Sequence, residues 1–299
     1  MSWHYILFGL VFESEIELPE LVAADAGRSI DVFIRLGRLE DGLPSKLGLH
    51  PVAPGRALLC IGEAGRYLCV DGRAIFVEPQ PDVSVRNLRL FLLGSAMGLL
   101  LHQRGLLPIH ANAVEIDGKA YAFMGPSGSG KSTLAVWFQD RGYRLCCDDV
   151  CVVSFDETGR PLVWPGLPRL RLWRDVLDRT GRDAAQFQRS FQDDDDREKY
   201  DVPAMAVAAE PIALGGLYLL ERADEREFEL LGGVIAMDAI FANIYRGEFL
   251  SAGELERQWQ TCLHLAATVP VQRWRRQWGH EQCNEEIRAL LDQITGKIP

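Results

Sequence analysis

A glycine-rich segment in the middle of the chain has the residue types and the spacing of a phosphate-binding loop (P-loop). It matches the pattern Gly-x-x-x-x-Gly-Lys-Ser, and the residues expected to bind a nucleotide are Gly125, Pro126, Ser127, Gly128, Ser129, Gly130, Lys131, Ser132 and Thr133. Glycines adopt backbone conformations that a side chain would forbid, so successive N–H groups can turn inward around phosphate oxygens. A helix that begins at the end of the loop adds the positive end of its dipole. The segment therefore predicts a nucleoside triphosphate site.

Two side chains of the P-loop add chemistry to its backbone. Lys131 is spaced to reach the β- and γ-phosphates, and the hydroxyl group of Ser132 suits a magnesium ion. A glycine-rich surface turn is the less favoured interpretation, because a strand is predicted before the loop and a helix after it. We therefore expect ATP and Mg²⁺ as the cofactors.

A pair of acids, Asp148 and Asp149, follows the P-loop by one predicted helix and one predicted strand. We expect the pair to end the strand that adjoins the P-loop strand. Neighbouring strand residues point to opposite sides, so one carboxylate can meet a metal ion while the other faces a phosphate acceptor. A solvated turn is less favoured, because residues 145–147 and 150–153 on either side are mostly apolar.

The elements that must position these groups are predicted from local patterns. Asp117-Gly118 between two apolar runs predicts a β-hairpin whose second strand leads into the P-loop. Gly142 is expected to end the helix after the loop. The expected elements, in order, are the strands Ala111–Ile116 and Lys119–Met124, a helix from Ser132 to about Arg141, the strand Tyr143–Cys147 and its continuation Val150–Phe155.

The rest of the chain divides into a β-rich beginning and a mostly helical end. The predicted N-terminal strands are Tyr5–Phe12, Asp31–Leu36, Ala57–Ile61, Tyr67–Val70 and Ala74–Val77. A buried helix is predicted from Arg86 to about Gln103, and a buried strand at Leu214–Glu221. Residues 161–168 are expected to form a loop, with a short helix around Leu172–Thr180. The predicted C-terminal helices are Ala236–Tyr245, Glu254–Ala267 and Glu281–Ile294. We place a domain boundary between residues 1–85 and 86–299.

Composition narrows the class of protein. The 299 residues carry a formal net charge of −10, which argues against nucleic acid or an anionic membrane as a partner. The apolar run Leu90–Leu101 is too short to cross a bilayer. The seven cysteines contain no C-x-x-C pair and are expected to be reduced thiols. With no signal-peptide pattern at the start, we expect a cytoplasmic protein. The acidic run Asp193–Asp196 is expected to be a solvated loop.

The stretch from His110 to Val150 resembles the catalytic domain of HPr kinase/phosphorylase. The matching residues are His110-Ala-Asn-Ala-Val-Glu-Ile, then Gly-Pro-Ser-Gly-Ser-Gly-Lys-Ser-Thr-Leu-Ala, then Arg141-Gly-Tyr-Arg-Leu-Cys-Cys-Asp-Asp-Val. The closest resemblance is to the HPr-kinase-related serine kinases found beside lasso-peptide genes. Their opening is similar to Phe8-Gly-Leu-Val-Phe-Glu-Ser-Glu-Ile-Glu-Leu-Pro-Glu-Leu.

This resemblance implies an α/β fold with a phosphoenolpyruvate-carboxykinase-like P-loop kinase core, a small β-rich N-terminal domain and a helical C-terminal part. It implies that Asp148 is the general base, that Asp149 assists the metal and that His110 lies near the reacting phosphate. The glycine-rich signature of HPr kinases is not found downstream, which argues against HPr as the acceptor and against the reverse phosphorylase reaction. Arg169 or Arg171, near its expected place, is a candidate for stabilising transition-state charge.

The resulting hypothesis is an ATP- and Mg²⁺-dependent kinase that phosphorylates a serine hydroxyl of a peptide or protein, with a lasso-peptide precursor as the first candidate acceptor. Two alternatives stay open: a small-molecule kinase on the same scaffold, and a regulatory protein that binds a nucleotide without transferring phosphate. Because HPr kinases form rings, the resemblance also implies a homo-oligomer.

Overall fold

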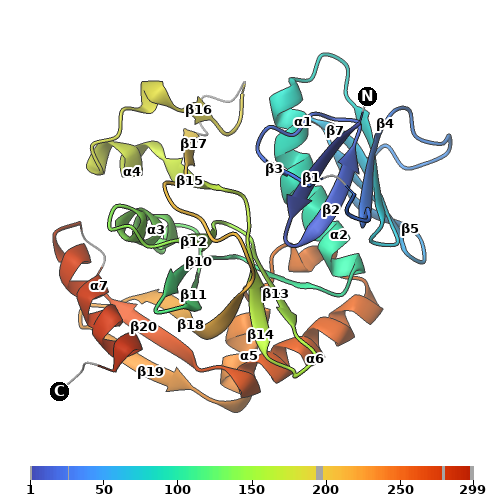
Figure 1. The fold of residues 1–299 in the computed structure, drawn as a ribbon. Helices are drawn as coiled ribbons and strands as arrows, with labels where there is room; N and C mark the ends of the chain where they lie inside the picture. Colours follow the sequence, from blue (N-terminus) through green and yellow to red (C-terminus); the bar gives the residue numbers. More distant parts are fainter. Residues whose placement is uncertain (1, 26, 193–197, 278–279, 297–299) are drawn as a thin grey trace.

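The computed structural model describes residues 2–25, 27–192, 198–277 and 280–296, so the run Asp193–Asp196 lies outside the described residues. In this part of the chain, the strands form three sheets of a mixed α/β protein. Figure 1 shows the first sheet beside the sheet that carries the P-loop, with the smallest sheet above the latter. Within the described residues, no helix combines the length and the apolar character that crossing a membrane requires.

The first sheet is built from residues 3–79. Its strands, in spatial order, are β3 (Val22–Ala23), β1 (Trp3–Leu7), β2 (Leu10–Ser14), β4 (Val32–Leu36), β8 (Ala74–Pro79), β7 (Gly65–Val70), β6 (Arg56–Ile61) and β5 (Gly48–Ala53). The pairs β2–β4 and β4–β8 are parallel, and the remaining pairs are antiparallel. The predicted strands that correspond to β4, β6, β7 and β8 are confirmed.

The prediction of one strand over Tyr5–Phe12 is wrong, because the chain reverses in its middle. Leu7 pairs with Leu10, so Phe8 and Gly9 form a two-residue turn between β1 and β2. Both turn residues have positive φ, 53° and 76°, which is the signature of a type I′ turn. Asparagine, aspartate or glycine is the usual first residue of such a turn. A bulky phenylalanine there costs about 1–2 kcal/mol and gives no turn signal in the sequence.

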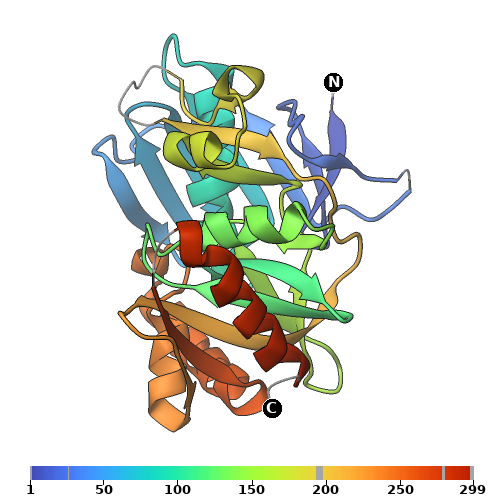
Figure 2. The same ribbon diagram turned by 90° about the vertical axis from the view of Figure 1, so that its left-hand side faces the viewer.

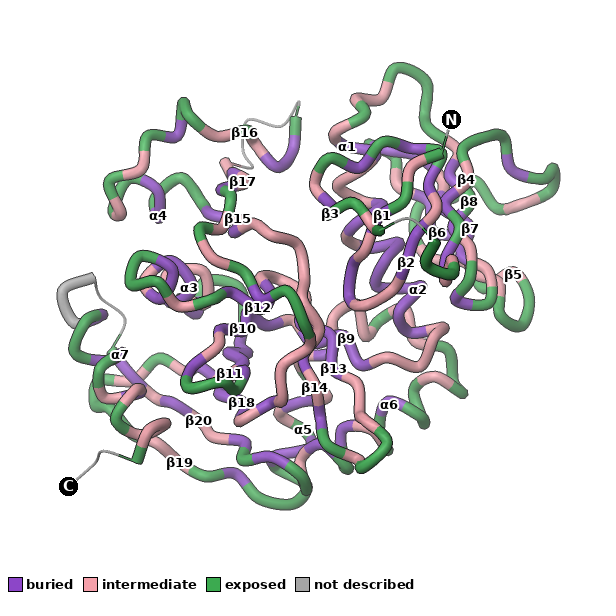
Figure 3. Tube along the Cα trace, viewed as in Figure 1, coloured by how far each residue is buried: buried purple, intermediate pink, exposed green. Residues whose placement is uncertain are grey.

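The buried helix predicted from Arg86 to Gln103 is confirmed, with a π-helical segment in its middle. It comprises α1 (Val85–Phe91), η1 (Leu92–Ala96) and α2 (Met97–Gln103). The Ser84 side chain caps it by accepting a hydrogen bond from the Asn87 backbone N–H. The helix shares a hydrophobic core with the first sheet, and the Tyr67 hydroxyl donates to the Leu88 carbonyl over 2.9 Å. Figure 3 shows buried residues along the helix and along strands of this sheet. The domain division at residues 85 and 86 stays a prediction.

The second sheet holds the P-loop strand. Its main strands, in spatial order, are β12 (Leu145–Cys147), β10 (Ala111–Ile116), β11 (Lys119–Met124), β18 (Ile212–Arg222), β14 (Pro161–Trp164), β13 (Cys151–Phe155) and β9 (Leu107–Ile109). Two further strands, β19 (Glu227–Leu231) and β20 (Val271–Arg276), extend it from β18. The predicted hairpin is confirmed, with its strands at Ala111–Ile116 and Lys119–Met124 and its turn at Asp117-Gly118.

Helices cover both faces of this sheet, and the alternation of its residues explains which helices pack where. Ala113 and Ala122 belong to the core under α5 (Gly233–Phe241) and α6 (Ala252–Thr268). Their neighbours Val114 and Phe123 belong to the opposite core, under α3 (Lys131–Gln139) and α7 (His280–Thr295). Period-two alternation places successive residues on opposite faces. The result is a three-layer arrangement, visible in Figure 2.

The predicted place of Asp148 and Asp149 in the sheet is wrong in one respect. Their strand β12 pairs with β10, so β10 lies between it and the P-loop strand β11. The partner of β11 on its other side is β18. Residues 150–155 do not continue β12 either, because the chain turns at Asp149 and β13 pairs with β9 and β14. Either strand of the hairpin could have paired with β12 on its outer side. Local sequence does not reveal that β10, and not β11, does so.

A small third sheet lies above the P-loop helix. It consists of β15 (Arg169–Trp173), β17 (Lys199–Pro203) and β16 (Gln188–Arg189), accompanied by α4 (Arg174–Arg179), which confirms the short predicted helix, and by η2 (Ala184–Gln186). The strand β14 replaces part of the predicted loop at 161–168. The C-terminal part contains β19 and β20 in addition to the helices predicted there. All seven cysteines are buried and unbridged, as expected.

Candidate nucleotide-binding and phosphotransfer site

The P-loop joins the end of β11 to the start of α3 and is shaped by its glycines. Gly125, Gly128 and Gly130 have φ of 143°, 83° and 85°, a region that disfavours any side chain. A Cβ atom at Gly130 would also lie 2.7 Å from a guanidinium nitrogen of Arg276. The turn is closed by the Ser129 N–H, which donates to the Pro126 carbonyl over 3.1 Å. The predicted loop geometry is therefore present.

Lys131 lies folded over the P-loop. Its ammonium group donates to the carbonyls of Gly125 at 2.5 Å and Pro126 at 3.1 Å. Burial lowers the pKa of Lys131, against the opposing effect of Asp149 and Asp148. These two carbonyl groups hold the Lys131 ammonium group beside the loop. Phosphate oxygens are charged and would be stronger hydrogen-bond acceptors for the ammonium group than the carbonyls are.

Two asparagine contacts that sequence reasoning missed anchor the loop at its ends. Asn112 on β10 donates from Nδ2 to the Lys131 carbonyl, and Asn243 accepts the Gly125 N–H at 3.1 Å. Asn112 lies within the His110-Ala-Asn segment, whereas Asn243 follows α5 and is remote in sequence. Because an asparagine has no intrinsic preference for such a role, only the folded contacts identify it.

The two aspartates after β12 have carboxyl groups of different acidity. Burial, and then the neighbouring charge of Asp149, raise the pKa of Asp148 to about 6. Burial alone would also raise the pKa of Asp149, but Arg171 and then Lys199 lower it overall. The Asp148 Oδ2 atom accepts the backbone N–H of Arg171 at 2.7 Å. A pair of acids with diverging pKa values is typical of an acid–base site.

Asp149 is held by two neighbours in a left-handed backbone conformation with φ of 72°. Its Oδ2 atom lies 3.0 Å from Nη1 of Arg171. Its Oδ1 atom lies 3.5 Å from Nδ1 of His110, and that nitrogen is 3.1 Å from the Asp149 carbonyl oxygen. Because of this backbone turn, the separation of the two carboxylates does not follow from simple strand alternation.

His110, at the end of β9, is a neutral neighbour of these groups. Burial lowers its pKa, while Asp149 opposes that effect. Its ring stacks on Tyr245 with centroids 6.2 Å apart, and its backbone N–H donates to the Asn243 carbonyl over 2.7 Å. The predicted position of His110 near the reacting groups agrees with this geometry, and its role stays a prediction.

Arg171 connects the aspartates to a second charged cluster. It lies opposite Asp201 in the pairing of β15 and β17, with its Nε atom 3.6 Å from the Asp201 carboxylate. Arg169 on the same face of β15 also pairs with Asp201. Arg86 on α1 reaches the same carboxylate at 2.7 Å. The alternation of Arg169 and Arg171 was visible in the sequence, whereas Asp201 and Arg86 were not identifiable before folding.

One pocket, with an empty volume of about 690 Å³, brings the predicted residues together. Residues 127–133 of the P-loop line one side, and His110, Asp148 and Asp149 line another. Gly125 and Pro126 are not among its lining residues. Arg171 and Lys199 also face the pocket, so it contains local positive charge although the net charge is −10. Such a pocket suits a polyphosphate.

The predicted magnesium ligands fit the ion by their chemistry. Ser132 and Asp149 line the same pocket and supply hard oxygen donors. No cluster of three or more metal-binding side chains exists among the described residues. Magnesium does not need one, because it is commonly held by one or two protein oxygens, substrate phosphates and water.

No protein-family model matches the chain, and no curated protein matches it. Among solved structures, the chain is similar to the HPr(Ser) kinase/phosphatase from Coxiella burnetii, with 14% sequence identity and a TM-score of 0.35. The match covers 64% of this chain and 99% of that one.

Proposed function

We propose that this chain is a kinase that uses ATP and Mg²⁺ to phosphorylate a hydroxyl group. The observation that carries the proposal is the single pocket in which a P-loop faces two carboxylates of different pKa. A P-loop alone would suit any nucleoside triphosphate-binding protein. The carboxyl group of Asp148, with a pKa of about 6, adds a base matched to transfer near neutral pH.

The residues perform the transfer by positioning and charge neutralisation. The P-loop amides and Lys131 hold the phosphates. The acceptor oxygen bonds to the γ-phosphorus while the bond to the β–γ bridging oxygen breaks, leaving its electron pair on ADP. The acceptor proton passes to Asp148, and Arg171 is near enough to offset the charge that develops.

Magnesium, when bound, would supply positive charge that offsets the charge of the phosphates. Ser132 and Asp149 are the residues that would hold it. In the described structure Asp149 is paired with Arg171, so Arg171 orients that carboxylate and maintains its ionised form.

The finer part of the proposal concerns the acceptor. We take it to be a serine of a peptide or protein, with a lasso-peptide precursor as first candidate, and the core to be phosphoenolpyruvate-carboxykinase-like. The sequence resemblance from His110 to Val150 supports these assignments. A small-molecule acceptor is separated from this proposal by assaying free serine, sugars and nucleosides beside peptides.

The test is transfer of labelled γ-phosphate from ATP, with Mg²⁺, to a serine-ended precursor peptide. We expect Lys131→Ala to lose ATP binding and transfer together. We expect Asp148→Asn to retain ATP binding and to lose transfer by about 10²-fold or more, because it cannot accept the proton. Asp178→Asn, an exposed position on α4, is the matched control and should behave as wild type.

Two results would contradict the kinase assignment. The first is absence of label on every acceptor class, with ATP binding intact. That result would favour a nucleotide-sensing protein. The second is Lys131→Ala indistinguishable from wild type, which would remove the P-loop from the function altogether.

A further inference from the structure

A second cavity lies against the same two aspartates, on the side of the N-terminal sheet. It is a narrow cavity that shares Asp148, Asp149 and Arg171 with the nucleotide pocket. Its other walls include Phe8 from the β1–β2 turn, Gly94 from η1 and Tyr245. The carboxylates therefore stand between the cavity and the P-loop pocket. This is where an acceptor would meet a phosphate held by the P-loop.

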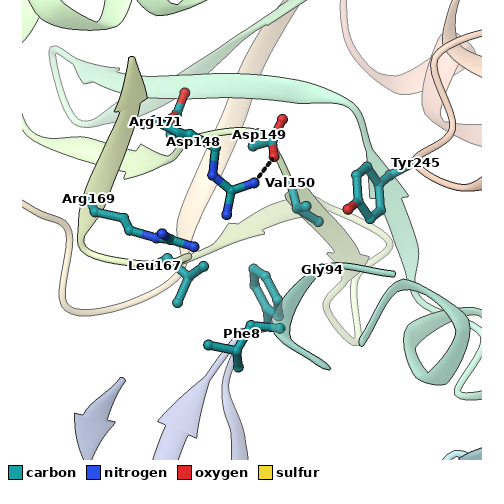
Figure 4. A pocket seen from close by; sticks show the side chains of 10 residues that line it. Phe8, Gly94, Asp148, Asp149, Val150, Leu167, Arg169, Arg171 and Tyr245 are labelled. Carbon is teal, nitrogen blue, oxygen red and sulfur yellow. Dashed lines mark hydrogen bonds and ion pairs between the residues drawn. The ribbon is translucent and has the colours of Figure 1, made fainter. Parts of the chain in front are cut away.

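Phe8 forms the wall of this cavity that faces the aspartates. Figure 4 shows its ring extending from the N-terminal sheet toward Arg171 and Asp149, with Tyr245 at one side. The ring is buried, with 4% of Phe8 exposed. Phe8 therefore closes the cavity on the side opposite the charged groups.

The turn that carries Phe8 is held in place by its contacts with Trp164 and Pro165. The Phe8 N–H donates to the Pro165 carbonyl over 3.2 Å. A Cβ atom at Gly9 would lie 2.2 Å from the Trp164 ring, which shows how closely the turn backbone approaches β14. Phe8 keeps a φ of 53°, which is unfavourable for a bulky residue. Strained residues that the surrounding structure holds in place cluster at active sites and ligand clamps.

The chemical consequence concerns water. A γ-phosphate beside a general base can be attacked by water as well as by an alcohol. In that case the water oxygen bonds to phosphorus, the bridging bond breaks with its electron pair on ADP, and the water proton passes to Asp148. Closed active sites suppress this side reaction by excluding water. A fixed aromatic wall next to the aspartates is suited to that task.

We propose that Phe8 is a specificity-determining residue, whose ring forms the acceptor-side wall of the active site and sets the ratio of phosphate transfer to ATP hydrolysis. This inference rests on the proposed kinase function. It gives the N-terminal sheet a direct part in the reaction, through a turn placed at the phosphate acceptor.

The experiment uses Mg·ATP with water as the only acceptor and measures inorganic phosphate release. The variant is Phe8→Asn, which removes the ring and creates Asn-Gly, the favoured pair for a type I′ turn. We expect phosphate release to rise on the order of tenfold, because water gains access to the site. The dissociation constant of Mg·ATP should stay within about twofold, because Phe8 does not line the nucleotide pocket.

Two controls distinguish the effect of removing the Phe8 ring from a general disturbance of the fold. Phe33→Asn changes an exposed ring on β4 and should leave phosphate release unchanged. Adding Lys131→Ala to Phe8→Asn should abolish the extra release, which assigns it to this site. Phe8→Leu retains apolar volume and is expected to raise release by about twofold. It serves as the test variant if thermal melting shows that Phe8→Asn is unfolded.

The outcomes distinguish this inference from the kinase proposal. If wild type and the Phe8 variant bind Mg·ATP equally and release phosphate at the same rate, the wall role is overturned and the kinase proposal stands. If wild type shows no ATP binding that depends on Lys131, the kinase proposal fails and this inference fails with it.

Discussion

At the scale of single residues, the most informative feature is the contrast between two adjacent aspartates. The Asp149 carboxylate lies 3.0 Å from the guanidinium group of Arg171 and 3.5 Å from the imidazole ring of His110. Among the described hydrogen bonds, the carboxylate of Asp148 accepts only the backbone N–H of Arg171. One carboxylate is therefore kept ionised, while the other can gain and lose a proton near neutral pH. Burial and the adjacent charge of Asp149 raise the pKa of Asp148, while Arg171 and Lys199, which are distant in sequence, lower the pKa of Asp149.

The first prediction is the pH dependence of transfer. Burial raises the pKa of Asp148 to about 6, and the base must be ionised to accept a proton. We expect the transfer rate to be level above this pH and to fall about tenfold per pH unit below it. Rates measured between pH 4.5 and 8.5 with saturating ATP test this. A rate constant unaffected between pH 5 and 7 would exclude Asp148 as the base.

The second prediction is that Asp148→Asn stabilises the folded protein. Because the pKa of Asp148 is raised on folding, to about 6, the native state binds this proton more tightly than the unfolded chain. Stability therefore falls as pH rises from about 4 to about 6. Asparagine carries no charge and therefore avoids this loss of stability at higher pH. Its side-chain oxygen can still accept the Arg171 N–H.

We expect Asp148→Asn to be more stable than wild type by about 1–3 kcal/mol at pH 8, with the gain disappearing near pH 4. Urea denaturation at both pH values measures the difference, with Asp178→Asn as the control. Equal stability of variant and wild type at pH 8 would argue that the carboxyl group is not strained by burial.

At the scale of elements, the P-loop depends on what surrounds its glycines. Gly128 and Gly130 have nearly the same positive φ, 83° and 85°. A Cβ atom at Gly128 meets open space, whereas one at Gly130 would collide with Arg276. Alanine at both positions therefore introduces the same backbone strain, and only one of them adds a steric conflict.

The third prediction compares these two variants. Gly128→Ala should destabilise the ligand-free protein by about 1 kcal/mol through strain alone. Gly130→Ala should lower the melting temperature further, because it displaces the buried Arg276 side chain. Thermal unfolding without nucleotide measures both. Identical melting temperatures would mean that the Arg276 side chain moves aside without a loss of stability.

Sequence alone predicted the elements whose signals are local. The hairpin around Asp117-Gly118, the P-loop and the helix after it were found because turn, glycine and capping patterns lie within a few residues. The strand order was not accessible, because the pairing of β11 with β18 joins distant segments. The Phe8-Gly9 turn was missed because its first residue contradicts turn preference. The Asp201 cluster required β17 to be aligned with β15.

At the scale of the whole molecule, Asp201 joins parts that are far apart in the sequence. Arg86 comes from the helix on the N-terminal sheet, and Arg169 and Arg171 come from the strand beside the aspartates. All three arginines share this carboxylate, and the Ser190 hydroxyl donates to it at 2.7 Å. The side chains of this cluster are mostly buried, so removal of the acid takes from Arg86 and Arg169 their carboxylate partner, while Arg171 keeps Asp149.

The fourth prediction is that Asp201→Asn destabilises the protein by about 3–5 kcal/mol, as expected when one partner of a buried ion pair is removed. Asp178→Asn removes an exposed partner of Arg174 and should change stability by less than about 1 kcal/mol. Chemical denaturation of both variants makes the comparison. If both variants lose a similarly small amount of stability, water solvates the arginines that pair with Asp201 in the wild type.

The order of strands in the second sheet has a consequence for the protein during its synthesis. Most strands of the N-terminal sheet pair with close neighbours in sequence, so that sheet can assemble early on the ribosome. The P-loop strand is different, because Ala120 pairs with Leu214 and β18 in turn pairs with Val271–Arg276 near the end of the chain. A nascent chain thus carries its whole P-loop sequence long before the sheet that supports it is complete. Nucleotide capture should therefore be among the last abilities the chain acquires as it emerges.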